Sequence, residues 1–186
     1  TSVKYLGITI TSDLKWTTHI NAVCGKAKST IGFLKRNLNI NSKSIKENAY
    51  KSLVRPSLEY ACAAWDPYLK TDIDKLDKVQ RRAARYVTNR YHNTSSVSEM
   101  VEQLEWKSLQ DRRKHARLNM LYKMVNNKVQ IDTSEKLIPI TRKSRNFNSM
   151  AFQIPNSRIN ARKESFCPRT ITQWNTLPTE AFKTRL

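Results

Sequence analysis

The sequence predicts a mainly α-helical fold, a helical bundle with a short N-terminal strand and an irregular, loop-rich C-terminal part. Three observations favour this class. Residues 3–10 alternate like a β-strand, apolar residues then recur every three or four positions to about residue 126, and residues 127–165 lose that helical periodicity. The 186 residues suffice for one domain, or for two small helical subdomains, with a buried core.

The opening segment predicts a short strand or one arm of a hairpin. Val3, Tyr5, Ile8 and Ile10 alternate around Gly7. No partner strand is evident nearby, so we expect this segment to complete a sheet whose remainder lies upstream. The absence of an initiator Met favours the same interpretation, that the chain is a fragment.

Three helices are expected between residues 16 and 68. The first is long and amphipathic, the second begins near Ser42, and Pro56 ends the second and can begin the third. Their apolar positions predict a core of Trp16, Ile20, Val23, Ala27, Ile31, Leu34, Ile45, Ala49, Leu53, Leu58 and Trp65. Lys26, Lys28, Lys35 and Arg36 lie largely off the stripe of the first helix.

A fourth helix is expected from Thr71 to about Val87. Asp72, Asp74 and Asp77 lie in its first turns, where carboxylates complement the helix dipole. At 100° per residue its apolar and basic residues separate onto two faces. The apolar face holds Ile73, Leu76, Val79, Ala83 and Val87, and the basic face holds Lys75, Lys78, Arg81, Arg82 and Arg85.

Two further helices and a loop-rich segment follow. Ser96 and Glu99 have the spacing of a capping box, and Ser108 can cap a helix that runs to about Asn126 and is buried on two sides. Residues 127–165 predict a long loop that carries one or two short strands, such as 150–154, and several cations, among them Arg142, Lys143, Arg145, Arg158, Arg162 and Lys163. Pro168 can begin a last helical turn with Ile171 and Trp174, and Pro178 ends it.

The charge balance points to a polyanionic partner. The chain has 34 Lys and Arg against 15 Asp and Glu, a formal net charge of +19. Nucleic acid is the default partner for such a domain, with an anionic membrane surface or simple solubility as alternatives. No apolar run approaches the length of a membrane span.

The residue types that catalysis or metal binding requires are sparse. Cys24, Cys62 and Cys167 are far apart, which argues against a disulfide framework and a zinc site and favours a reducing compartment. The acids form no pair able to hold two Mg²⁺ ions, and three glycines cannot build a phosphate loop. We therefore predict no catalytic centre, no metal site and no cofactor in this chain.

Several motifs, taken in order, resemble one family. The N-terminal motifs are Val3-Lys4-Tyr5-Leu6-Gly7-Ile8, Asp13-Leu14-Lys15-Trp16 and His19-Ile20; the central ones are Leu53-Val54-Arg55-Pro56, Trp65-Asp66-Pro67 and Val79-Gln80-Arg81-Arg82-Ala83. The C-terminal ones are Arg112-Arg113, Ser165-Phe166-Cys167-Pro168-Arg169-Thr170 and Trp174-Asn175-Thr176-Leu177-Pro178. Nearly the whole chain resembles the thumb and C-terminal region of non-LTR retrotransposon (LINE-type, CR1/L2-like) reverse transcriptases.

The resemblance implies a parent RNA-directed DNA polymerase whose fingers and catalytic palm lie upstream. It implies that residues 1–12 form the end of the palm and that residues 13–68 form a thumb-like bundle. Residues 69–126 would then form basic post-thumb helices, and residues 127–186 a loop-rich C-terminal segment. Such a thumb grips RNA, DNA or an RNA–DNA hybrid through phosphate contacts. The expected contacts are Lys26, Lys28, Lys35, Arg36, Lys75, Lys78, Arg81, Arg82 and Arg85, and Tyr5, Leu6 and Gly7 are primer-proximal by analogy.

The resemblance further implies the missing fingers–palm region as a partner and an intracellular, nuclear location during action on target DNA. One departure is that many family members carry a Cys/His knuckle after the thumb, which three widely spaced cysteines cannot form. A domesticated helical module that binds a protein partner is the alternative function. A free-standing enzyme has no residues to support it.

Overall fold

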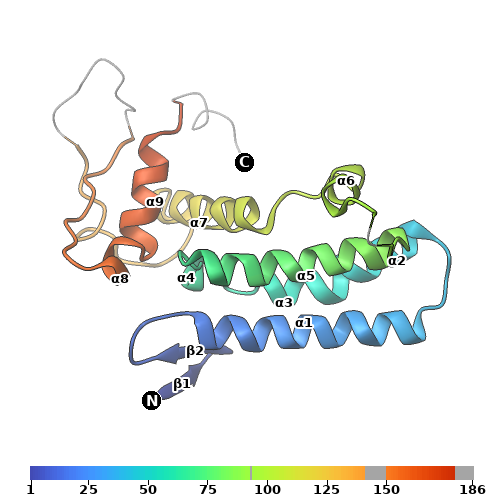
Figure 1. Ribbon diagram of the computed structural model, residues 1–186. Helices are drawn as coiled ribbons and strands as arrows, with labels where there is room; N and C mark the ends of the chain where they lie inside the picture. Colours follow the sequence, from blue (N-terminus) through green and yellow to red (C-terminus); the bar gives the residue numbers. More distant parts are fainter. Residues whose placement is uncertain (93, 141–149, 179–186) are drawn as a thin grey trace. The chain divides into compact units, whose positions relative to one another are not determined.

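The mainly α-helical class is confirmed by the computed structural model, which describes residues 1–92, 94–140 and 150–178 (Figure 1). The described chain divides into two compact units, Thr1–Arg113 and Lys114–Leu186. The first contains a hairpin and most of the helices, and the second contains the loop-rich part. The predicted basic residues Arg142, Lys143 and Arg145 lie outside the described residues.

The N-terminal segment pairs with itself, which corrects the expectation that its partner strand lies upstream. Strands β1 (Ser2–Tyr5) and β2 (Ile8–Thr11) form an antiparallel hairpin in which Tyr5 pairs with Ile8. Leu6 and Gly7 both have positive φ, 45° and 83°, as a two-residue type I′ turn requires. Leu6 is unusual at such a position, and for that reason the turn was not evident from the sequence.

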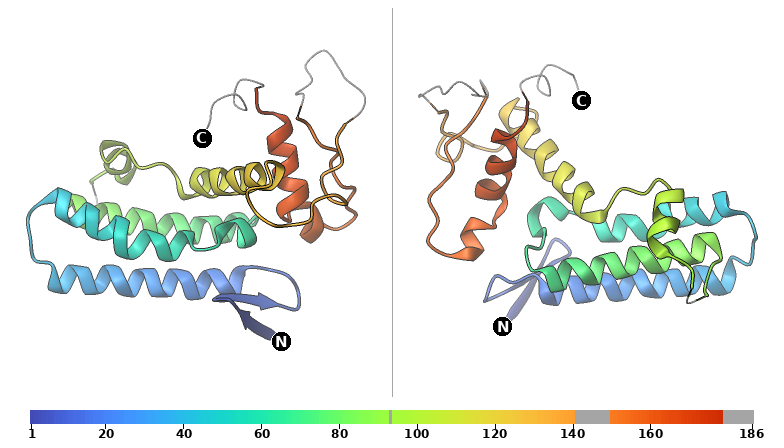
Figure 2. Two further views of the ribbon diagram at one scale, coloured as in Figure 1. Left: turned by 180° about the vertical axis from the view of Figure 1, so that it is seen from behind. Right: turned by 45° about the horizontal axis from the view of Figure 1, so that its top comes forward.

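Helices α1 (Thr17–Asn37) and α5 (Lys70–Thr88) lie side by side and form the centre of the first unit, as both views in Figure 2 show. The predicted stripe of α1 is buried at Ile20, Ala27, Ile31 and Leu34, while Trp16 and Val23 are half-buried. On α5 the predicted apolar face is buried at Leu76, Val79, Ala83 and Val87, with Ile73 half-buried.

The helix after Ser42 buries a different face from the one predicted. Ile45 and Leu53 were expected in the core but are 45% and 55% exposed; the buried residues are Lys46, Tyr50, Val54 and Leu58. In a regular α-helix this four-residue spacing would drift around the axis by about 120° over twelve residues. A π-helical turn, η1 (Tyr50–Val54), joins α2 (Lys43–Ala49) to α3 (Arg55–Glu59) and counters the drift.

The same π turn lets the helix continue through Pro56, where the sequence predicted an end. The amide of Arg55 donates to the carbonyl of Tyr50, five residues back, so the turn before Pro56 is wider than an α-helical turn. That width moves the preceding carbonyls away from the proline ring, which in a regular helix would clash with them. The break comes later, at Ala61, which has a φ of 50° and precedes the short α4 (Cys62–Trp65).

Trp65 anchors this region of the core. It is fully buried, its indole Nε1 donates to the carbonyl of Tyr60 at 2.7 Å, and its ring meets that of His19 edge-on with centroids 5.0 Å apart. The structure therefore agrees with the interpretation of Trp65 as a core residue.

Helix α6 (Val97–Gln103) begins as predicted, with the Ser96 hydroxyl accepting from the amide of Glu99 at 3.4 Å. Helix α7 (Leu109–Val125) is likewise capped by Ser108, whose hydroxyl accepts from the amide of Asp111 at 3.0 Å. The two arginines that interrupt its apolar stripe are both buried. Within the first unit, Arg113 is fully buried and its Nε donates to Asp66 at 2.7 Å.

The second unit is built around α9 (Phe166–Asn175), which begins two residues before the predicted start at Pro168. Its small core consists of Leu121, Leu137, Phe152, Ile171 and Trp174. The Asn175 side chain accepts from the amide of Phe152 and donates to its carbonyl, at 3.1 and 2.8 Å. In the described part of 127–165, regular structure amounts to the short α8 (Asn160–Lys163) and a bridge between Pro139 and Phe152 within the predicted strand.

Across the described residues, none of the helices combines the length and the apolar character that spanning a membrane requires.

Candidate nucleic-acid interface

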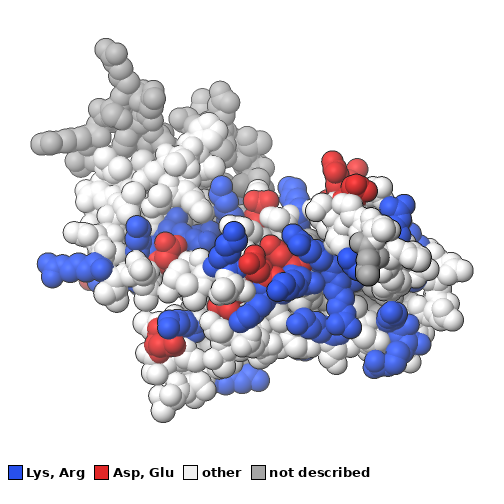
Figure 3. Space-filling view, viewed as in Figure 1, with Lys and Arg blue, Asp and Glu red and all other residues white. Residues whose placement is uncertain are grey.

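The outer face of α5 carries the clearest group of exposed cations. Lys78, Arg81 and Arg82 are exposed and Arg85 is half-buried, while the opposite side of the helix is in the core. None of these four side chains forms an ion pair with a described residue. Lys and Arg side chains gather over this helix in Figure 3, with carboxylates beside them. We call these four residues the α5 cationic face.

The length of this face sets how many phosphates it can contact. From residue 78 to residue 85 a helix rises by about 10 Å. Phosphates of one duplex strand recur about every 3.4 Å along the axis, so roughly three lie within that length. Asp74, one turn before Lys78, is exposed and reduces the positive potential at that end.

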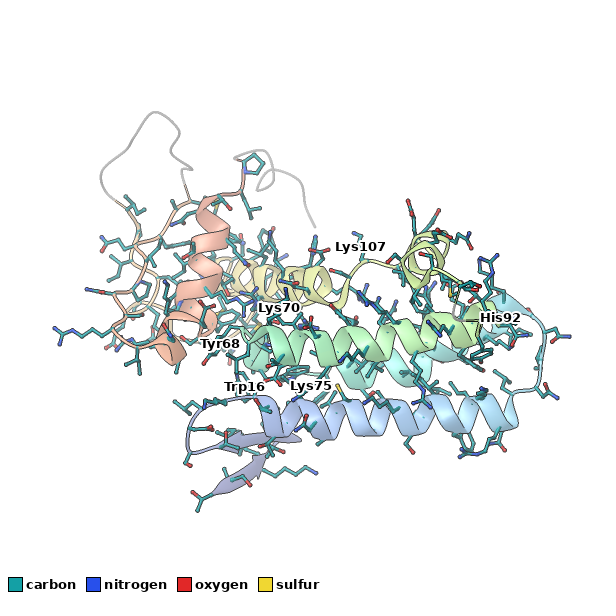
Figure 4. All side chains as sticks on the ribbon, viewed as in Figure 1. Trp16, Tyr68, Lys70, Lys75, His92 and Lys107 are labelled. Carbon is teal, nitrogen blue, oxygen red and sulfur yellow. The ribbon has the colours of Figure 1, made fainter. Side chains whose placement is uncertain are left out.

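Lys75, the fifth cation predicted for this helix, is occupied within the fold. Its Nζ lies 2.9 Å from Oδ1 of Asp72, a carboxylate that is only 1% exposed (Figure 4). The other oxygen of Asp72 accepts from the hydroxyl of Thr17 at 2.7 Å. Asp72 therefore ties the start of α5 to the start of α1, a role beyond the helix-dipole role predicted for it. A phosphate at Lys75 would have to compete with this carboxylate.

The basic residues of α1 do not share one face. Lys26, Lys28, Lys35 and Arg36 are all exposed. Lys28 and Lys35, seven residues apart, point the same way, whereas Lys26 lies about 160° around the helix from Lys28. The Nζ of Lys35 lies 4.2 Å from the ring centroid of Tyr91, close enough for a cation–π contact. Lys28 and Lys35 are therefore the best aligned of these four for contact with one strand.

Tyr5, Leu6 and Gly7 lie at the tip of the hairpin. Tyr5 and Leu6 are 65% and 72% exposed. The hydroxyl of Tyr60 donates to the carbonyl of Leu6 at 3.3 Å, and a Cβ at Gly7 would lie 3.4 Å from the Tyr60 ring. The tip is thus held against the end of α3 while its side chains face solvent.

The three thiols are buried or half-buried, and the buried carboxylates of Asp66 and Asp72 are paired within the fold. Burial raises the pKa of the Cys24 and Cys167 thiols, and that of Cys62 to about 11, which disfavours the reactive thiolate. Asp66 and Asp72 are committed to Arg113 and Lys75. No group of three or more His, Cys, Asp or Glu within the described ranges is placed to hold a metal ion.

Sequence reasoning missed a second group of cations, which lines a pocket of about 470 Å³ in the first unit. Lys43, Lys51, Arg55, Lys107 and Arg112 contribute to it from segments far apart in the chain. A helical wheel compares residues within one helix, so it carries no signal for this grouping.

Comparisons of the chain with protein-family models, with curated proteins and with solved structures each gave no match. The resemblance to LINE-type reverse transcriptases stays a prediction.

Proposed function

We propose that this chain is a nucleic-acid-binding thumb and C-terminal region of a LINE-type reverse transcriptase, which grips the template–primer duplex through basic helices. The observation that carries the proposal is the α5 cationic face, where Lys78, Arg81 and Arg82 are exposed beside the half-buried Arg85. Phosphate contacts of this kind hold a duplex without reading its sequence, as a polymerase that slides along its template requires. We assign the polymerase chemistry to the missing fingers–palm region and the site of action to nuclear target DNA.

The test removes three charges from α5 and, in a matched control, three from elsewhere. Lys78→Gln/Arg81→Gln/Arg82→Gln changes only exposed residues, and the control Lys114→Gln/Lys123→Gln/Lys163→Gln removes the same charge from exposed positions. Affinity for an RNA–DNA hybrid is measured over a series of salt concentrations. Each lost phosphate contact flattens the log–log salt dependence by about 0.9, so the α5 variant should lose roughly 2–3 units of slope.

The weakening should be similar for hybrids of different sequence, and the variant should retain its melting temperature. Equal losses from the two triple variants would mean that affinity follows net charge alone, and the α5 proposal would then be wrong. If the α5 triple variant bound the hybrid with parental affinity, the α5 cationic face would be a solvated surface that does not contact nucleic acid.

A helical protein-interaction module is the second candidate, favoured by the exposed apolar side chains Phe33, Ile45 and Leu53. An Ile45→Ser/Leu53→Ser variant should keep its affinity for the hybrid under the first proposal. If the unmodified chain bound the hybrid weakly and with little dependence on salt, the protein-interaction module would be the favoured function.

A further inference from the structure

The pocket of about 470 Å³ lies within the first unit, on the side of α5 opposite its cationic face. Its lining comes from the α2–η1–α3 helix, from Gln80 of α5, from residues 103–107 at the end of α6 and in the connection to α7, and from Arg112. Gln80 is buried, whereas Lys78, Arg81 and Arg82 are exposed. The pocket and the α5 cationic face are therefore separate surfaces.

Three contacts hold the walls of the pocket in place. The indole Nε1 of Trp106 donates to Glu47 Oε1 at 2.9 Å, and its ring stacks on Tyr50 with centroids 4.3 Å apart and planes 17° from parallel. The side-chain amide of Gln80 donates to the carbonyl of Lys107 at 3.0 Å. The segment that closes the pocket is thus fixed to both neighbouring helices, and the pocket is preformed.

The lining holds more cations than its carboxylates neutralise. Glu47 pairs with Lys51 at 2.7 Å, and Glu59, behind the lining, accepts two hydrogen bonds from Arg112 and lies 3.9 Å from Arg55. The other two lysines of the lining, Lys43 and Lys107, are exposed and form no ion pair with any residue that the structure describes. They leave two ammonium groups at the pocket for an anionic ligand, with Glu105 as the remaining acid of the lining.

Tyr50 adds a buried donor. It lines the pocket and is only 2% exposed, and its hydroxyl has no hydrogen-bond partner among the described residues. Burial and the nearby Glu59 raise its pKa, so the hydroxyl stays protonated. A buried hydroxyl without a partner can donate to an acceptor oxygen of a ligand that reaches it.

We propose that this pocket binds a phosphate group, either free phosphate or the phosphate of a nucleotide, held by Lys43 and Lys107 with Tyr50 as a further donor. A phosphate group carries close to two negative charges and only acceptor oxygens, which matches a lining with surplus cations and N–H and O–H donors. The volume exceeds that of a phosphate group and leaves room for an attached nucleoside beside Trp106. Inorganic phosphate and a nucleotide are the two sources of this chemistry.

Binding to the whole chain is measured by calorimetry with inorganic phosphate, with adenosine 5′-monophosphate and with adenosine. We expect phosphate and the nucleotide to bind and adenosine not to bind. Tighter binding of the nucleotide would identify the nucleotide as the ligand, and equal binding would identify free phosphate. Either result supports the site. Adenosine binding as tightly as the nucleotide, or no binding of either phosphate compound, would overturn it.

Variants locate the site. Lys43→Gln/Lys107→Gln changes two exposed side chains and should weaken binding of both phosphate compounds at least tenfold without altering the melting temperature of the free protein. Tyr50→Phe keeps the ring stacked on Trp106 and should weaken binding less. The control Lys78→Gln/Arg82→Gln should bind phosphate like the parent while losing hybrid affinity, so the two proposals can fail separately. The proposed site would be refuted if the Lys43→Gln/Lys107→Gln variant bound phosphate as tightly as the parent. It would also be refuted if the Lys78→Gln/Arg82→Gln control lost as much phosphate binding as that variant.

Discussion

Leu53 and Leu58 lie five residues apart on the helix that runs through the π turn, and they provide a direct test of which face it buries. Leu58 is fully buried, whereas 55% of Leu53 is exposed. Replacing a buried leucine by alanine costs about 2–5 kcal/mol through lost burial and the cavity left behind. Surface substitutions usually change stability by about 0.5 kcal/mol or less, and alanine is a good helix former.

Leu58→Ala should therefore destabilise the first unit by roughly 3 kcal/mol, and Leu53→Ala by less than about 1 kcal/mol. Urea denaturation followed by circular dichroism measures the difference. With a slope of about 1–3 kcal/mol/M, Leu58→Ala should lower the midpoint by about 1–3 M and Leu53→Ala should scarcely move it. Equal losses from the two variants, or a larger loss from Leu53→Ala, would refute the assigned face and the π turn that produces it.

Three further predictions follow from buried groups and from the acids. Arg113→Met should destabilise the fold by about 3–5 kcal/mol because it leaves Asp66 charged and buried, and adding Asp66→Asn should restore part of the loss in the same urea assay. Burial lowers the pKa of His19, whose Nδ1 accepts from the amide of Thr9 at 3.3 Å. As the pH drops below about 6.5, the unfolded chain therefore binds a proton at His19 more readily than the folded chain does. The free energy of unfolding should decrease as the pH is lowered through this range, and His19→Gln should make it depend less on pH. The purified chain should extend no primer with Mg²⁺ or Mn²⁺, and a chelator should leave its melting temperature unchanged; extension, or a drop of several degrees, would reveal a site we missed.

Helices with clean apolar stripes and local caps could be predicted from the sequence. Ile20 and Leu76 are buried as their spacing predicts, and Ser96 and Ser108 cap the helices they precede. These features depend on neighbours three or four residues away, so a short window of sequence contains the necessary information. The separation of basic and apolar faces on α5 was predictable for the same reason.

The features that were not predicted depend on longer-range contacts or on unusual backbone. The buried stripe of the second helix includes Lys46, whose charge hides it from an apolar pattern; its Nζ lies 5.5 Å from the ring centroid of Tyr86. Pairing of Lys75 with Asp72 is local, but it is fixed by Thr17, 55 residues away. The pocket depends on Trp106 reaching Glu47, 59 residues away. A pattern within one helix contains neither Tyr86 as the neighbour of Lys46, nor Thr17, nor the pairing of Trp106 with Glu47.

The π turn at Tyr50–Val54 also bears on how this chain tolerates changes in length. Such a turn accommodates one residue more than regular α-helical geometry would, so a single-residue deletion there could be absorbed by conversion to an α-helical turn. In other helices of the first unit, the same deletion would rotate everything downstream by about 100° and turn buried side chains outward. Related sequences that differ in length by one residue between 50 and 54 should therefore be aligned with the gap inside this turn.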